Sequence, residues 1–234
     1  MTRPNIRART LASLLALGGF QLAGCAGTPA APVAPDAAVT LDRGFAAPGT
    51  ALPPLVDRSQ GIALHSCADL IAALRAAKDL GELAESPRFN GYVDCMAMAL
   101  IADGHGPRDA SFDVRHAGER IYRDLDLASV ASSLAPRRPS EHYRLQDFKF
   151  DSVQVDPLSA VLQGNGFSYT FQVLALGDFR HLGKTELLVR FTDRATNQGT
   201  YDKQSVLVLD ATPPSTALQA TDAIEVLKAG APAH

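Results

Sequence analysis

The spacing of apolar residues changes once along this chain of 234 residues, and that change limits the folds open to it. Between about residues 61 and 140 apolar residues recur every three to four positions, as in helices, whereas from Tyr143 onward they alternate with polar ones, as in strands. Pro136 and Pro139 lie at the boundary, where proline ends a helix. The pattern predicts an α+β fold: N-terminal helices, then an antiparallel sheet of four or five strands and a short C-terminal helix.

The helical region is expected over residues 61–140. Ser66 is a residue type that caps helix N-termini, and Gly81 is expected to end the first helix. Gly104 is expected to end the second helix in a left-handed conformation. The predicted segments are 66–81, 91–103 and 112–134.

An antiparallel β-meander is expected over residues 141–212. Residues 167–173 alternate strictly, which predicts a strand with one buried face and one wet face. A break in the alternation favours a β-bulge near Ser152. Residues 213–234 are expected to form a short helix and tail that pack with the sheet as one folded unit. Further strands are predicted at 187–191 and 201–209, with hairpin turns at 164–166 and 197–199.

The first 24 residues have the three parts of a secretion signal. Arginines precede an apolar run over 11–20, which is too short to cross a bilayer core of roughly 30 Å. The segment from Leu22 to Cys25 resembles the lipobox of bacterial lipoproteins. This resemblance implies that residues 1–24 are removed and that the Cys25 thiol carries a diacylglycerol, with a further chain such as palmitate usual in the class. The alternative is an ordinary signal peptide with a chance cysteine.

The resemblance also implies a location. Lipoproteins retained at the inner membrane typically carry Asp after the cysteine, whereas position 26 is Ala, so we expect lipid anchoring at the outer membrane, facing the periplasm. Residues 25–60 are rich in Ala, Pro, Gly and Thr and are expected to form a flexible tether. Such a tether spans on the order of 30 Å.

The charge of the mature chain limits its partners. The signal peptide contains three of the 22 basic residues and no acidic ones, which leaves 19 basic against 25 acidic residues and a formal charge of −6. Nucleic acid and anionic lipid surfaces require clustered Lys and Arg. The composition therefore predicts no nucleic-acid partner.

Two cysteines remain once Cys25 is acylated. Cys67 lies at the start of the first predicted helix and Cys95 lies inside the second. Disulfides persist outside the cytosol, so a structural Cys67–Cys95 bridge is expected rather than two unpaired thiols.

Residues 177–189 contain the most suggestive motif. They resemble, in one copy, the strand-connecting loop of FG-GAP-type calcium repeats, and Asp178, Gly183 and Glu186 match its pattern. Arg180 and Leu182 occupy the positions of two further acids. Calcium needs six to eight oxygen ligands, so Asp178 and Glu186 are weak metal candidates, and a structural loop is the expected alternative.

No catalytic residue or cofactor is predicted. Asp109 with Asp113, and Asp124 with Asp126, are close in sequence, but a solvated helix face is the expected role of such pairs. The histidines lack the short paired spacings of zinc sites; they are His65, His105, His116, His142, His181 and His234.

Three functions are compatible with these features. The favoured one is a lipid-anchored binding module that recognises another envelope protein, in its sharper form an immunity or inhibitor lipoprotein that blocks a cell-wall hydrolase. The alternatives are a structural or assembly accessory of an outer-membrane or secretion machine, and a hydrolase acting on peptidoglycan or lipid.

Overall fold

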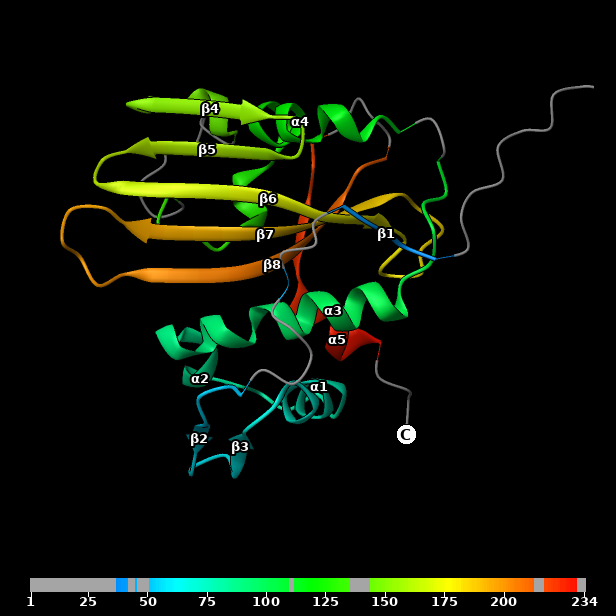
Figure 1. Ribbon diagram of the computed structural model, residues 1–234, viewed down its shortest axis with the longest axis vertical. Helices are drawn as coiled ribbons and strands as arrows, with labels where there is room; N and C mark the ends of the chain where they lie inside the picture. The colour runs from blue at the N-terminus through cyan, green and yellow to red at the C-terminus, as the bar shows by residue number, and fades with distance from the viewer. Residues whose placement is uncertain are drawn as a thin grey trace, which may run out of the picture. The chain divides into compact units, whose positions relative to one another are not determined.

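An antiparallel sheet of seven strands organises the fold (Figure 1). The computed structural model describes residues 37–41, 45, 51–109, 112–134, 144–212 and 217–230. Six strands are hydrogen-bonded in chain order, and β1 pairs with the C-terminal part of β6. The strands are β1 (Val39–Thr40), β4 (Ser152–Asp156), β5 (Ser159–Gly164), β6 (Phe167–Gly177), β7 (Glu186–Ala195), β8 (Asp202–Asp210) and β9 (Ala220–Asp222).

Helices lie against both faces of this sheet. Figure 1 shows α3 running along β8 with α1 and α5 beside it, and α4 near β4 and β5. A separate two-stranded hairpin packs against α1. The helices are α1 (Cys67–Arg75), α2 (Glu82–Glu85), α3 (Val93–Asp103), α4 (Ala117–Asp124) and α5 (Ala223–Ala229), the hairpin is β2 (Leu55–Asp57) with β3 (Ile62–Leu64), and short 3₁₀ turns cover Pro87–Tyr92, Val114–His116, Leu127–Ser129 and Leu145–Asp147.

Two apolar cores result, one on each face of the sheet. Leu188 packs with α1, α3 and α5, whereas its neighbours Leu187 and Val189 pack with α4 on the opposite face. All three side chains are fully buried. At residues 167–173 the predicted alternation is present, with Tyr169, Phe171 and Val173 buried and the residues between them only partly buried. At Leu187–Val189, by contrast, helices cover both sides of the sheet, and side chains of both faces are buried.

The mixed α and β character predicted from the sequence is confirmed, but the details differ. The sheet is larger than the four or five strands expected, because the short strands β1 and β9 extend it at positions without an alternation pattern. The N-terminal half is also not purely helical, since β1, β2 and β3 precede α1.

Of three local features predicted from the sequence, the turn at 164–166 is present, whereas the bulge near Ser152 and the left-handed helix end at Gly104 are not. The β5–β6 hairpin turns at Asn165 and Gly166, both with positive φ, as the 164–166 segment predicts. The β4–β5 pairing is regular from Ser152 onward, and the recorded register shift lies in β6, between Val173 and Ala175. Gly104 has φ −72°, so the expected left-handed helix end is wrong at that residue.

Part of the segment that was expected to be a flexible tether is in strands. Val39 and Thr40 pair with Leu176 and Ala175 of β6, and residues 55–57 form β2. Leu55 is buried, and Ala38, Leu41 and Leu52 pack partly buried against the apolar cores, whereas Val39 and Val56 are exposed. A flexible tether through residue 60 is therefore wrong for these residues; residues 25–36 lie outside the described part.

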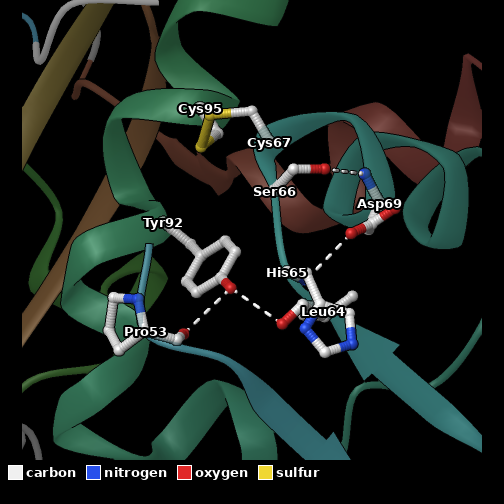
Figure 2. The surroundings of a disulfide bond; sticks show 8 residues. All are labelled: Pro53, Leu64, His65, Ser66, Cys67, Asp69, Tyr92 and Cys95. Atoms are coloured by element: carbon white, nitrogen blue, oxygen red, sulfur yellow. Dashed lines mark hydrogen bonds between the residues drawn. A yellow bond between two sulfur atoms is a disulfide. The ribbon is translucent and has the colours of Figure 1, made fainter. Parts of the chain in front are cut away.

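The predicted disulfide is confirmed. Cys67 at the start of α1 is bonded to Cys95 in α3 (Figure 2). Ser66 caps α1 as expected: its hydroxyl accepts the Asp69 amide at 3.2 Å, and the Asp69 carboxylate accepts the His65 amide at 2.8 Å. These backbone and Ser66 hydrogen bonds lower the pKa of Asp69.

Candidate functional site

The segment that resembles a calcium loop connects β6 to β7, and we call residues 178–185 the 178–185 loop. Asp178 is 1% exposed. One of its carboxylate oxygens accepts the amide of Leu182 at 2.9 Å, and the other accepts the amide of Gly183 at 3.0 Å. The Asp178 carboxylate therefore binds backbone amides four and five residues further along its own loop.

Glu186 closes the loop from the other end. This residue is fully buried, and its Oε2 atom accepts the amides of Phe179 at 2.8 Å and Arg180 at 3.0 Å. Its Oε1 atom accepts the Nε–H of Arg180, which makes a charge-assisted pair. Asp178 and Glu186 together bind four loop amides, so the carboxylates hold backbone donors where the calcium repeats would hold a cation.

The middle of the 178–185 loop faces solvent. Leu182 is 57% exposed, although leucine is an apolar side chain. His181 and Gly183 have φ +57° and +69°, the left-handed region, which bends the loop sharply around Leu182. Gly183 is suited to this conformation, whereas His181 bears a steric cost there. The buried carboxylates thus hold a strongly bent loop in one conformation, and the apolar side chain of Leu182 is exposed at its middle.

A second segment packs beside the loop through backbone pairing. The amide of His105 donates to the Asp178 carbonyl at 3.2 Å, and the Asp178 amide donates to the His105 carbonyl at 2.9 Å. Arg108, in the same segment, donates its Nε–H to the Asp178 carboxylate at 3.3 Å and its Nη2–H to His105 Nδ1 at 3.1 Å. The rings of His105 and His181 meet edge to face with centroids 4.5 Å apart. Sequence reasoning missed this pair because the two histidines are 76 positions apart.

A cleft of about 440 Å³ adjoins the loop. Its lining includes buried apolar side chains, Leu100 from α3, Phe179 from the loop, and Val226 and Leu227 from α5. Exposed Leu182 lines it from the loop side. Charged groups also line it, namely Arg75, Asp103 and Glu225. The cleft therefore combines a buried apolar lining with charges of both signs.

Arg180 links the loop to the sheet below the cleft. Besides Glu186, its guanidinium donates to the Thr221 hydroxyl at 3.3 Å, and its Nη2 atom lies 3.8 Å from the Asp210 carboxylate. Asp210 also pairs with Lys184. The ion pairs with Asp210 connect the loop to β8, and the hydrogen bond to Thr221 connects it to β9, so the loop is part of the folded unit.

The other carboxylates noted in the sequence have local structural partners. Asp113 accepts two guanidinium N–H groups of Arg115, and this contact lowers the pKa of Asp113 to about 2. Asp124 pairs with Arg123 at 2.9 Å, and Asp126 caps a 3₁₀ turn by accepting the Ala128 amide. Asp109 donates its amide to Thr185 at the base of the loop at 2.7 Å. These contacts stabilise turns and loop ends.

Within the described ranges, no three His, Cys, Asp or Glu side chains are grouped so that they could hold one metal ion. No helix in the described part of the chain is long and apolar enough to span a bilayer. Cys25, His142 and His234 lie outside the described residues.

No protein-family model, curated protein or solved structure matches this chain.

Proposed function

We propose that the protein is a lipid-anchored binding module at the periplasmic face of the outer membrane, and that it recognises another envelope protein through the 178–185 loop and the adjoining cleft. The observation that carries the proposal is the exposure of Leu182 on a loop whose amides are bound by buried Asp178 and Glu186. A loop already fixed in one conformation loses little entropy on binding, so more of its contact energy becomes affinity.

The chemistry of this face suits a protein partner. Protein interfaces combine an apolar, desolvated centre with a polar surround. Leu182 and the cleft beside it supply apolar surface, and Arg75, Asp103 and Glu225 supply charges of both signs around it.

In its sharper form, the proposal is an immunity or inhibitor lipoprotein that blocks a cell-wall hydrolase. A rigid loop with an apolar residue at its middle can enter an enzyme's substrate cleft without rearranging. The small acidic mature chain and the Cys67–Cys95 bridge suit a stable periplasmic inhibitor.

Replacing Cys25 tests the anchor. Two or three acyl chains bury at about 0.8 kcal/mol per methylene, so the processed wild-type protein should sediment with membranes. The Cys25→Ser variant should instead accumulate as a soluble or unprocessed protein. If the processed variant still sediments with membranes, the lipid is not the anchor.

A photo-crosslinking amino acid at position 182 tests recognition. Position 56 on β2 is the matched control, because Val56 is 54% exposed against 57% for Leu182. We expect a covalent adduct with one envelope protein from position 182 but not from position 56. Leu182→Asp should abolish binding of that protein, whereas Val56→Asp should leave it intact.

The identity of the adduct separates the possible functions. A cell-wall hydrolase that the purified protein inhibits supports the inhibitor form. Subunits of a large secretion or outer-membrane machine would instead support the accessory alternative. Identical adducts from positions 182 and 56, or none from position 182, would overturn recognition through this face.

A further inference from the structure

We infer that His105 and His181 together bind a divalent first-row transition-metal ion of the zinc or copper class, a site independent of the proposed recognition function. Both side chains are exposed, and their Nδ1 atoms lie 3.4 Å apart. Imidazole nitrogen is a preferred ligand of Zn²⁺ and Cu²⁺. The two rings come from segments that meet only in the folded chain.

The separation of the two nitrogens fits one metal ion between them. Zinc lies about 2.0–2.1 Å from imidazole nitrogen, and at a tetrahedral angle two such ligands are separated by roughly 3.3–3.4 Å. His105 and His181 already have this separation. Little movement of either ring is therefore needed to place an ion within bonding distance of both.

Arg108 shows which nitrogen of His105 carries a lone pair. A guanidinium can only donate hydrogen bonds, and Arg108 Nη2 lies 3.1 Å from His105 Nδ1. His105 Nδ1 is therefore the unprotonated nitrogen, and the Arg108 guanidinium donates to its one lone pair. An ion that binds both Nδ1 atoms requires His181 to carry its ring proton on Nε2; a proton on Nδ1 would move there through solvent, so the ring stays neutral and no proton is lost overall.

Arg108 occupies the neighbourhood that a cation would take. Its guanidinium bridges His105 Nδ1 and the buried carboxylate of Asp178. The Arg108 side chain is 49% exposed and can turn into solvent, whereas Asp178 is fixed by loop amides. Metal binding thus exchanges one cation for another beside the same carboxylate, and Arg108 competes with the metal.

The backbone holds both ligands in place before any ion arrives. His105 exchanges two backbone hydrogen bonds with Asp178, and His181 is held in a left-handed conformation by the amides that Asp178 and Glu186 bind on either side of it. Strained residues at fixed positions are a feature of binding sites. Two protein ligands leave the remaining coordination positions to water, so binding should be reversible.

The test is zinc titration of the full-length chain, prepared in detergent without a histidine tag, by isothermal calorimetry, with copper as a second probe. We expect one saturable equivalent of zinc for the wild-type protein. His105→Ala and His181→Asn should each weaken it at least tenfold. Asparagine keeps the left-handed conformation accessible at position 181, so this variant should fold like the wild type.

Two further variants complete the test. Arg108→Ala should bind zinc more tightly than the wild type, because the competing guanidinium is gone. His116→Ala removes an exposed histidine that contacts Asp113 and Glu119 instead, and it should bind like the wild type. Wild-type affinity in the His105→Ala, His181→Asn double variant, or no zinc equivalent in the wild-type protein, would overturn the inference.

Discussion

Glu186 and Arg180 form an ion pair in which the same carboxylate also accepts the Arg180 backbone amide at 3.0 Å. Glu186 is fully buried, so its replacement by Ala removes the acceptor of two amides and the nearest carboxylate of the Arg180 guanidinium, which keeps only its longer contacts with Thr221 and Asp210. Breaking a buried pair from one side costs about 3–5 kcal/mol. We expect Glu186→Ala to lower the free energy of unfolding by about 3 kcal/mol in urea titrations, with a smaller loss for Glu186→Gln. Equal stability of the Ala variant and the wild type would contradict the pairing.

The Cys67–Cys95 disulfide closes a loop with a sequence separation of 28. Chain-entropy arguments give such a crosslink at most about 3.5 kcal/mol. Cys67→Ser should therefore lower the thermal midpoint in oxidising buffer and should match the reduced wild type in strong reductant. If the thermal midpoint of Cys67→Ser is below that of the wild type by the same amount in reductant and in oxidising buffer, the thiols do not pair.

Gly118 is the point of closest approach between α4 and the β4–β5 turn. A Cβ atom at this position would lie 2.1 Å from the Asp156 carbonyl oxygen and 2.5 Å from that of Ser159. Overpacking against backbone costs about 1–3 kcal/mol, and we expect Gly118→Ala to lower the free energy of unfolding by an amount near the upper end of this range. Gly91 is the control, since its nearest neighbour would be 3.8 Å away and Gly91→Ala should change stability by less than about 0.5 kcal/mol. Similar effects of the two substitutions in urea unfolding would contradict this packing.

Asp193 makes stability depend on pH in an unusual direction. Its fully buried carboxylate accepts the amide and hydroxyl of Ser133 at 2.6 and 3.0 Å and the Tyr201 hydroxyl at 3.3 Å. Burial nevertheless raises the pKa of Asp193. The folded state then binds more protons than the unfolded state above about pH 3.9, so this contribution to stability is greatest in acid and falls as pH rises through the raised pKa.

Urea unfolding between pH 3.5 and 7 measures this effect as the difference between the wild type and Asp193→Asn. Because asparagine does not titrate, the variant should gain stability relative to the wild type as pH rises. The absolute stability of the variant should be lower, since its amide group faces the Ser133 donors. A difference that is constant, or that moves in the opposite direction, would contradict a raised pKa.

Local patterns in the sequence predicted part of this fold. The Ser66 cap, the 164–166 turn and the Cys67–Cys95 bridge depend on residue types at short spacing or on a count of thiols, and all three are present. The mixed α and β architecture follows in the same way from the change of apolar period.

Such local patterns do not reveal contacts between residues that are far apart in the chain. The pairing of Val39 with Leu176 joins positions far apart in the chain, and a two-residue strand has no alternation to reveal it. The alternation over 167–173 predicts one wet face, whereas Leu187 and Leu188 pack into apolar cores on opposite faces of the sheet. The contact between His105 and His181 depends on the backbone pairing of His105 with Asp178, for which no sequence spacing gives evidence.

Amide hydrogen exchange of the 178–185 loop tests most directly whether this loop is a preformed binding element. The amides of Leu182 and Gly183 should be protected through Asp178, and those of Phe179 and Arg180 through Glu186. Asp178→Ala should release mainly the first pair, and added calcium should change neither pair in the wild type. Exchange of all four wild-type amides at the rate of an unstructured peptide, or protection that appears only with calcium, would contradict a preformed loop.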